Sequence, residues 1–309
     1  MAAVIEFQHV SKVYQRLFSE EKLAALSDVS FETAPGQVCA FLGPNGAGKT
    51  TSISMLMGFF FPTSGEIRVF GHPPGDMRAK EQIGFLPENF AFHKFLTAPK
   101  LLRFHLQLAG RDPSKAGNLI DELIHKVKLN GYENLKIGKY SRGMVQRIGI
   151  AQALLCDPNL IVLDEPTSGL DPAGRREVLQ LLMQLKAEGK TIFLSSHILP
   201  EVEQIADHVI IITRGKMVRS GRLQDLLAGG GQVEILADRV PDELLQTSLQ
   251  GCTVTPAAQG VRVLVEAARK RQAVESLWAA GCDVVAMTPL RSTLEDLFLK
   301  EVDGPGGAQ

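Results

Sequence analysis

The chain has 309 residues, a hydrophobic fraction of 45%, a charged fraction of 22% and a formal net charge of −1. This length is enough for one full α/β domain and a smaller second domain. The near-neutral charge gives no electrostatic case for nucleic-acid binding. The four cysteines lie far apart in the sequence and form no C-x-x-C pair, which fits a reducing compartment better than a secreted disulfide framework.

The first predicted elements are strands. Residues 5–10 alternate between apolar and polar side chains, as a half-buried strand does, and residues 29–32 are expected to pair with them. Residues 38–42 are continuously apolar and predict a buried strand. The most apolar window, residues 53–61, is too short to span a bilayer, so any membrane role is expected to come through a partner.

The next segment predicts a phosphate-binding loop. Residues 43–50 fit G-x-x-x-x-G-K-[ST] between the strand 38–42 and a predicted helix over 52–57. Glycines let backbone N–H groups turn around an anion, and the helix N-terminus adds its positive end. Lys49 offers an ammonium to the β- and γ-phosphates, and Thr50 offers a hydroxyl to Mg²⁺. The predicted nucleotide-binding residues are Gly43, Pro44, Asn45, Gly46, Ala47, Gly48, Lys49, Thr50 and Thr51.

A mostly parallel sheet with a helical insertion is predicted after this loop. Residues 65–70 and 83–86 predict short strands, and residues 97–155 predict a mostly helical stretch. Residues 160–163 and 191–194 are apolar runs typical of central parallel strands, and an amphipathic helix separates them. One buried helical face is predicted from the i, i+3, i+4, i+7 spacing of Ile120, Leu123, Ile124 and Val127.

The strand 160–163 ends in two carboxylates. Asp164 is suited to hold Mg²⁺ or its waters, and Glu165 is suited to polarise an attacking water. An Asp-Glu pair at a strand end is in isolation more often a solvated turn. A phosphate loop upstream reverses that expectation, because phosphoryl transfer needs a metal-binding carboxylate close to the loop.

The composition changes near residues 229–231, beyond which a small α+β domain is predicted. Its elements follow a β-α-β-β-α-β order, the split βαβ or ferredoxin-like plan. A further helix and a frayed tail, residues 304–309, are expected to follow. The strands are predicted over 233–236, 252–255, 261–265 and 283–287, and the helices over 242–249, 269–280 and 292–300.

Residues 140–147, which precede the carboxylate pair, are a third motif beside the phosphate loop and the Asp164–Glu165 strand end. With the phosphate loop and the Asp164–Glu165 strand, the chain resembles the ATPase subunits of ABC transporters, and residues 141–144 correspond to that family's signature. The resemblance implies a P-loop NTPase fold of ABC type over residues 1–225, with a helical subdomain at about 88–156, and an accessory domain over 226–309. It also implies that Ser141 and Gly143 bind the γ-phosphate held by an opposite subunit.

Three further positions take their expected roles from this resemblance. Residues 166–171 resemble the D-loop, in which Asp171 is expected to communicate across a dimer. Residues 195–197 resemble the switch segment, in which His197 is expected to bond the γ-phosphate and orient the catalytic water. Tyr14 is the expected aromatic platform for adenine, although an inserted segment, residues 16–23, follows it.

The chain departs from the usual family pattern at two places. The signature's usual Leu-Ser-Gly-Gly is Tyr140-Ser141-Arg142-Gly143 here, and Glu88 stands where the Q-loop has Gln. A carboxylate at this position can still accept hydrogen bonds from water on Mg²⁺. Both variants resemble the branch of ABC exporters whose ATPase is a separate polypeptide with a C-terminal extension, as do residues 293–299.

The resemblance therefore implies a subunit that binds and hydrolyses ATP with Mg²⁺ and powers a membrane transporter, and the branch that it resembles implies an exporter. The implied partners are an integral membrane permease and a second ATPase subunit, in a homodimer or heterodimer, at the cytoplasmic face of the cell membrane. Phe90, Phe92 and Phe95 either line the groove for the permease or form the core of the helical insertion. The alternatives are a non-transport ABC ATPase and a regulatory module that holds nucleotide without turnover.

Overall fold

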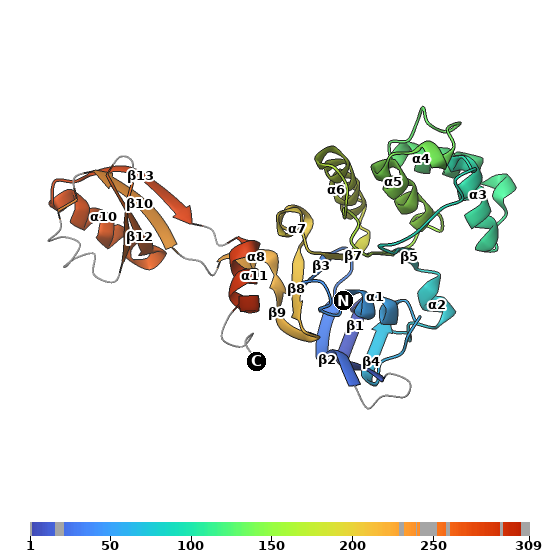
Figure 1. The fold of residues 1–309 in the computed structure, drawn as a ribbon, viewed down its shortest axis with the longest axis horizontal. Helices are drawn as coiled ribbons and strands as arrows, with labels where there is room; N and C mark the ends of the chain where they lie inside the picture. The colour runs from blue at the N-terminus through green and yellow to red at the C-terminus, as the bar shows by residue number, and fades with distance from the viewer. Residues whose placement is uncertain are drawn as a thin grey trace. The chain divides into compact units, whose positions relative to one another are not determined.

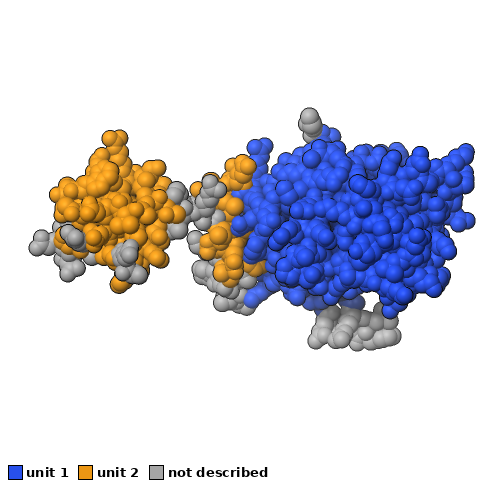
Figure 2. All heavy atoms as spheres, turned by 90° about the horizontal axis from the view of Figure 1, so that it is seen from above, with its two compact units in different colours: residues 1–223, 309 blue, residues 224–308 orange. Residues whose placement is uncertain are grey.

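The computed structural model describes residues 2–15, 22–228, 232–238, 240–241, 252–257, 260–290 and 293–303. The chain divides into two compact units, residues 1–223 and residues 224–308, which Figure 2 shows in blue and orange. The domain boundary predicted after residue 225 lies close to this division. The composition change at 229–231 and the predicted tail at 304–309 lie outside the described residues.

Unit 1 is built around a six-stranded sheet in the order β5-β6-β7-β3-β8-β9. The neighbours from β5 to β8 pair in parallel, and only β9 runs antiparallel to its neighbour. Short apolar runs fill the centre of this sheet, as is typical of buried parallel strands. The parallel pairing confirms the prediction of a mostly parallel sheet. The strands are β3 (Val38–Leu42), β5 (Ile83–Leu86), β6 (Leu160–Leu163), β7 (Thr191–Ser196), β8 (His208–Thr213) and β9 (Lys216–Arg222).

A three-stranded antiparallel sheet, in the order β2-β1-β4, accompanies the parallel one. Its strands are β1 (Ile5–Gln15), β2 (Lys22–Thr33) and β4 (Ser64–Val69). The predicted pairing of residues 5–10 with 29–32 is confirmed, since Phe7 lies opposite Phe31. Phe31 also stacks on Phe193 of β7, with ring centroids 5.9 Å apart. These rings, together with α1 (Lys49–Leu56), join both sheets in one hydrophobic core.

The predicted helical insertion consists of separate helices joined by 3-10 turns and loops. Figure 1 shows α3, α4 and α5 gathered away from the three-stranded sheet. The predicted face of α4 is confirmed as buried, because its apolar side chains recur once per helical turn. No helix in the described ranges is both long and apolar enough to cross a membrane. The remaining elements of unit 1 are α2 (Met77–Lys80), α3 (Ala98–Leu108), the 3-10 turns Pro113–Lys115 and Ile137–Lys139, α4 (Gly117–Lys126), α5 (Arg142–Ala153), α6 (Pro172–Ala187) and α7 (Leu199–Ile205).

Unit 2 contains an antiparallel four-stranded sheet in the order β11-β12-β10-β13. This is the strand order of the split βαβ plan. Helix α10 packs Ala273 and Leu277 against Val233, Ile235 and Val263 of the sheet. The helix predicted over 242–249 lies outside the described residues, so the complete ferredoxin-like plan stays a prediction. The elements here are α8 (Leu223–Ala228), β10 (Gln232–Asp238), β11 (Thr253–Pro256), β12 (Val261–Glu266), the 3-10 turn Ala267–Arg269, α10 (Lys270–Ala279), β13 (Asp283–Leu290) and α11 (Leu294–Asp303).

The aromatic contact between the two sheets generates a stability prediction. Phe31→Ala should lower the free energy of unfolding by about 3–5 kcal/mol, because it removes a ring that three buried phenylalanines surround. Urea unfolding followed by circular dichroism measures this change. Phe61→Ala is the matched control, since Phe61 is 71% exposed, and it should change the unfolding free energy by less than about 0.5 kcal/mol. Equal losses in both variants would contradict the assignment of Phe31 to the core.

Candidate functional site

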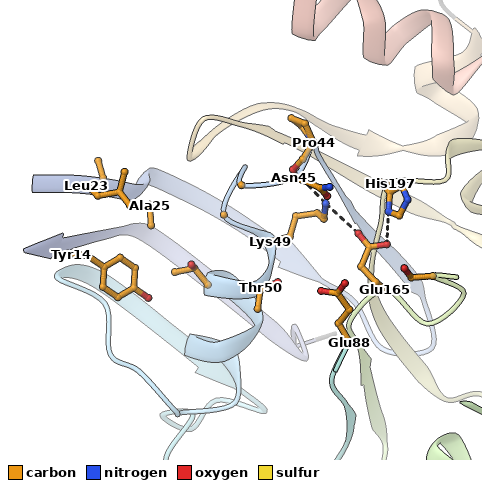
Figure 3. Close-up of a pocket in the computed structure, with 15 residues that line it drawn as sticks. Tyr14, Leu23, Ala25, Pro44, Asn45, Lys49, Thr50, Glu88, Glu165 and His197 are labelled. Atoms are coloured by element: carbon orange, nitrogen blue, oxygen red, sulfur yellow. Dashed lines mark hydrogen bonds and ion pairs between the residues drawn. The ribbon is translucent and has the colours of Figure 1, made fainter. Parts of the chain in front are cut away.

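A pocket of about 620 Å³ opens beside the phosphate loop of unit 1. This volume lies in the range of small-molecule sites. Figure 3 shows Tyr14 and Ala25 on one side of the pocket and His197 on the other, with Lys49 between them. Loops at the carboxyl ends of β3, β5, β6 and β7 supply most of the polar side chains, because parallel neighbours end at one edge of the sheet. The lining residues are Tyr14, Leu23, Ala24, Ala25, Pro44, Asn45, Gly46, Gly48, Lys49, Thr50, Thr51, Glu88, Glu165, Ser168 and His197.

Two glycines allow the loop its tight path. A Cβ on Gly43 would lie 2.4 Å from the carbonyl oxygen of Ile212. Gly48 has φ +110°, and a Cβ there would lie 2.6 Å from the carbonyl oxygen of Ala25. Side chains at these positions would therefore displace the backbone of β8 or β2. The first turn of α1 carries no acidic residue, so the positive end of its dipole stays available to an anion.

Lys49 is the only lysine among the described residues that line the pocket, and its side chain is 7% exposed. Its Nζ donates to the carbonyl oxygen of Gly43 at 2.6 Å and lies 3.2 Å from Oε1 of Glu165. A buried ammonium needs such partners, because the desolvation of an unpaired charge is costly. Lys49 therefore links the phosphate loop to the end of β6.

Asp164 lies directly after β6 and is 3% exposed, so it does not line the pocket itself. Its Oδ1 accepts a hydrogen bond from the Ser195 hydroxyl at 2.5 Å. Burial raises the pKa of Asp164, while hydrogen bonds from Ser195 and from Thr50 act in the opposite direction. The contact with Thr50 places the carboxylate and the hydroxyl together, as the sequence predicted. Both are the hard oxygen donors that Mg²⁺ prefers.

No cluster of three or more His, Cys, Asp or Glu side chains with metal-binding geometry occurs among the described residues. A Mg²⁺ site in a nucleotide pocket does not need one, because this ion is usually held by one or two carboxylates together with substrate phosphates and water. The donor pair of Asp164 and Thr50 therefore fits a magnesium ion that arrives with a triphosphate.

The side chains of Glu165 and His197 are in direct contact on one side of the pocket (Figure 3). Nδ1 of His197 lies 2.7 Å from Oε2 of Glu165, and the imidazole is 48% exposed. Glu165 has φ +49°, a left-handed conformation that is strained for a residue with a Cβ. Its backbone N–H donates to the Ser195 hydroxyl at 2.9 Å. The Ser195 hydroxyl therefore holds both carboxylate residues, since it donates to Asp164 and accepts from Glu165.

Tyr14 lines the pocket at the end of β1, where the sequence predicted an aromatic platform. Its ring meets Phe60 edge-on at 6.4 Å, and Nζ of Lys12 lies 5.2 Å from its centroid. Of the inserted segment after Tyr14, residues 16–21 lie outside the described residues.

Some predicted residues do not line this pocket. Gly43, Ala47 and Asp164 are buried residues next to lining residues in the sequence, but they are not part of the lining. Ser141 is the N-cap of α5 and accepts from the Met144 N–H at 3.2 Å. Asp171 is likewise the N-cap of α6. Because the signature and D-loop roles involve a second subunit, the assignments of Ser141, Gly143 and Asp171 stay predictions.

Other lining or supporting residues were missed by the sequence analysis. Ser195 was placed in the switch segment without a role of its own, and its position at the end of a buried strand was the available signal. Ser168 was likewise only part of the D-loop. No local pattern marks residues 23–25, which line the pocket only because β2 pairs with β1 beside Tyr14.

Comparison with known proteins agrees with this geometry. The ABC transporter family model matches residues 26–168. An uncharacterized ABC transporter ATP-binding protein of Nostoc sp. is 36% identical, with 97% of this chain and 90% of the relative covered. The bacitracin transport ATP-binding protein of Bacillus licheniformis is 34% identical, with 98% and 99% covered. A dimeric ATP-binding cassette in a post-hydrolysis state, bound to ADP and phosphate, superposes with a TM-score of 0.62 at 26% identity, covering 71% of this chain and 98% of that one.

The raised pKa of Asp164 predicts a pH-dependent stability difference. A raised folded pKa favours the protonated carboxyl, so stability is lost as the pH rises from the unfolded value of 3.8 through the folded one. Asp164→Asn keeps an acceptor oxygen for Ser195 but cannot ionise. We expect this variant to resist urea better than the wild type at neutral pH, with a difference that shrinks as the pH is lowered.

The matched control is Asp121→Asn on the exposed surface of α4. Its stability difference from the wild type should stay small across the same pH range. If Asp164→Asn were equally or less stable than the wild type at neutral pH, the account of a desolvated carboxylate at the end of β6 would be wrong.

Proposed function

The chain belongs to the ABC transporter ATP-binding proteins, and we propose that it is the ATP-hydrolysing subunit of an exporter. As a member of this family it is an ABC ATPase and an ATP-binding subunit of a transporter. The observation that carries the proposal is the convergence of Lys49, Glu165 and His197 on one pocket beside the phosphate loop. The bacitracin transport relative supports a role in transport, and the departures at Arg142 and Glu88 support the exporter branch.

In this proposal the phosphate loop and α1 hold the triphosphate. The backbone N–H groups of residues 43–51 and the positive end of α1 would face its oxygens. The Lys49 ammonium would bind the β- and γ-phosphates, which compete with Glu165 for the same cation. The adenine would stack on Tyr14, whose ring also contacts Phe60 and Lys12.

Thr50 and Asp164 would hold Mg²⁺, and Glu88 would accept a hydrogen bond from water on the metal. When bound, Mg²⁺ neutralises charge on the phosphate oxygens during transfer. Glu88 lines the pocket after β5, and β5 is the direct neighbour of β6. Its carboxylate thus lies on the same edge of the sheet as Asp164.

Glu165 would act as the general base toward the attacking water. In the present arrangement both of its oxygens are occupied, one by Lys49 and one by His197. A γ-phosphate that draws the Lys49 ammonium to itself would leave one carboxylate oxygen free to accept a proton. His197 would then bond the γ-phosphate and orient the water. The strained backbone of Glu165, fixed by Ser195, would keep its carboxylate aimed into the pocket.

A second ATPase subunit would complete each site. We propose that Ser141 and Gly143 of one subunit contact the nucleotide held by the other, and that Asp171 lies at the same interface. The N-terminus of α5 supports this role, since a serine-capped helix end presents free N–H groups to an anion. The dimeric cassette described above, which is bound to ADP and phosphate, supports the assembly of two such subunits.

An integral membrane permease would be the remaining partner and would hold this subunit at the cytoplasmic face of the membrane. Phe90 and Phe92 are half-buried, with ring centroids 5.1 Å apart, and Phe90 packs close to Gly149 of α5. Phe95 is 68% exposed. The first two rings therefore support the core of the helical insertion, and Phe95 is the better candidate for contact with the permease.

A substitution at Glu165 tests the catalytic part of the proposal. Glu165→Gln should bind ATP with unchanged affinity, accumulate an ATP-bound dimer and lose at least about 10²-fold in kcat, because an amide cannot accept the proton. Phosphate release and size-exclusion chromatography measure the two effects. Glu122→Gln, exposed on α4, is the control and should match the wild type. Wild-type turnover by Glu165→Gln would remove Glu165 from the role of base.

A second substitution tests the phosphate cradle. Lys49→Ala should weaken ATP binding by at least about tenfold, because a charge-assisted hydrogen bond to phosphate is lost. Isothermal titration calorimetry with Mg·ATP measures the affinity, and exposed Lys100→Ala is the control. Unchanged ATP affinity in Lys49→Ala would contradict the assignment of the triphosphate to this loop.

A further inference from the structure

Glu201 is a buried carboxylate that has no place in the mechanism above. It lies in α7, is 8% exposed and does not line the pocket. Both of its oxygens have partners. Oε2 accepts a hydrogen bond from the Thr167 hydroxyl at 2.5 Å, and Oε1 lies 3.7 Å from Nη1 of Arg175. Burying a carboxylate without such partners would be costly, so the three side chains form one unit.

The two partners of Glu201 bracket the segment that runs from Thr167 to Asp171. Thr167 begins this segment and is itself 3% exposed. The Leu170 N–H donates to the Thr167 carbonyl at 3.2 Å. Arg175 lies in the first turn of α6, and its Nε donates to the Leu170 carbonyl at 2.9 Å. The segment is thus held to Glu201 at both ends.

Glu201 is also tied to the histidine that faces the pocket. Helix α7 starts two residues after His197, at Leu199, and has seven residues. The Ile198 N–H donates to the Ser196 hydroxyl at 3.0 Å, and the Glu201 N–H donates to the Ile198 carbonyl at 3.2 Å. His197 therefore directly precedes the hydrogen-bonded turn over residues 198–201, which ends at Glu201.

We infer that Glu201 is a positioning residue that couples His197 to the segment 167–171. When His197 engages the γ-phosphate, the turn at the start of α7 carries Glu201 with it. Thr167 and Arg175 follow, because leaving the carboxylate buried without partners would be costly. The segment 167–171 thereby takes the position in which it contacts the second subunit. This inference rests on the proposed function, since it assigns the link between phosphate contact and dimer formation.

Substitutions at Thr167 test the role of its hydrogen bond to Glu201. Thr167→Val has the same shape but cannot donate to Glu201, whereas Thr167→Ser retains the donor. We expect Thr167→Val to lower kcat by about tenfold or more while the affinity for Mg·ATP stays within about twofold of wild type. Thr167→Ser should restore most of the turnover. In the Glu165→Gln background, Thr167→Val should bind ATP but fail to accumulate the ATP-bound dimer.

The matched control is Thr33→Val, at a threonine of β2 that is fully buried and whose hydroxyl has no nitrogen or oxygen partner among the described residues. It makes the same change of side chain without removing a bond to a carboxylate. Its kcat, ATP affinity and dimer formation should match the wild type. A thermal unfolding scan of each variant separates loss of coupling from loss of the fold.

The outcomes distinguish the inference from the function on which it rests. If the wild type hydrolyses ATP and Thr167→Val does so at the same rate, with normal dimer formation, the inference is wrong and the proposed function stands. If Thr167→Val lowers ATP affinity as much as kcat, Thr167 acts on binding and the inference is also wrong. If the wild type does not hydrolyse ATP and the Glu165→Gln variant does not form a dimer with ATP, the proposed function itself is wrong.

Discussion

The rest of the site depends on the buried ion pair between Lys49 and Glu165, in which Nζ lies 3.2 Å from Oε1. It joins the phosphate loop to the end of β6, two segments that the chain separates widely. A cation and a carboxylate buried together are stable only while they are paired. A triphosphate that binds the ammonium therefore acts on the carboxylate as well. Nucleotide binding and activation of the base are thus two consequences of one exchange of partners.

Much of this architecture is predictable from sequence because its signals are local. The phosphate loop combines an apolar strand, glycines and a helix within a short stretch, and each part constrains the next. Continuous apolar runs identified the central strands β6 and β7 for the same reason. In unit 2, alternation and turn residues were enough to predict every described strand to within a few residues.

The contacts that organise the site were not predictable, because they depend on which strands become neighbours. Ser195 reaches Asp164 only since β7 pairs with β6 in parallel. The same holds for Thr167 and Glu201, whose bond joins a loop after β6 to a helix after β7. The positive φ of Glu165 has no sequence signal either, since strain is a property of the folded backbone.

A structure of the chain with Mg²⁺ and a non-hydrolysable ATP analogue would test the central claim most directly. The account predicts that Nζ of Lys49 leaves Glu165 and lies within hydrogen-bond distance of β- and γ-phosphate oxygens, with the metal beside Thr50 and Asp164. A pocket without nucleotide at saturating analogue, or an analogue bound while Lys49 still contacts Glu165, would contradict it.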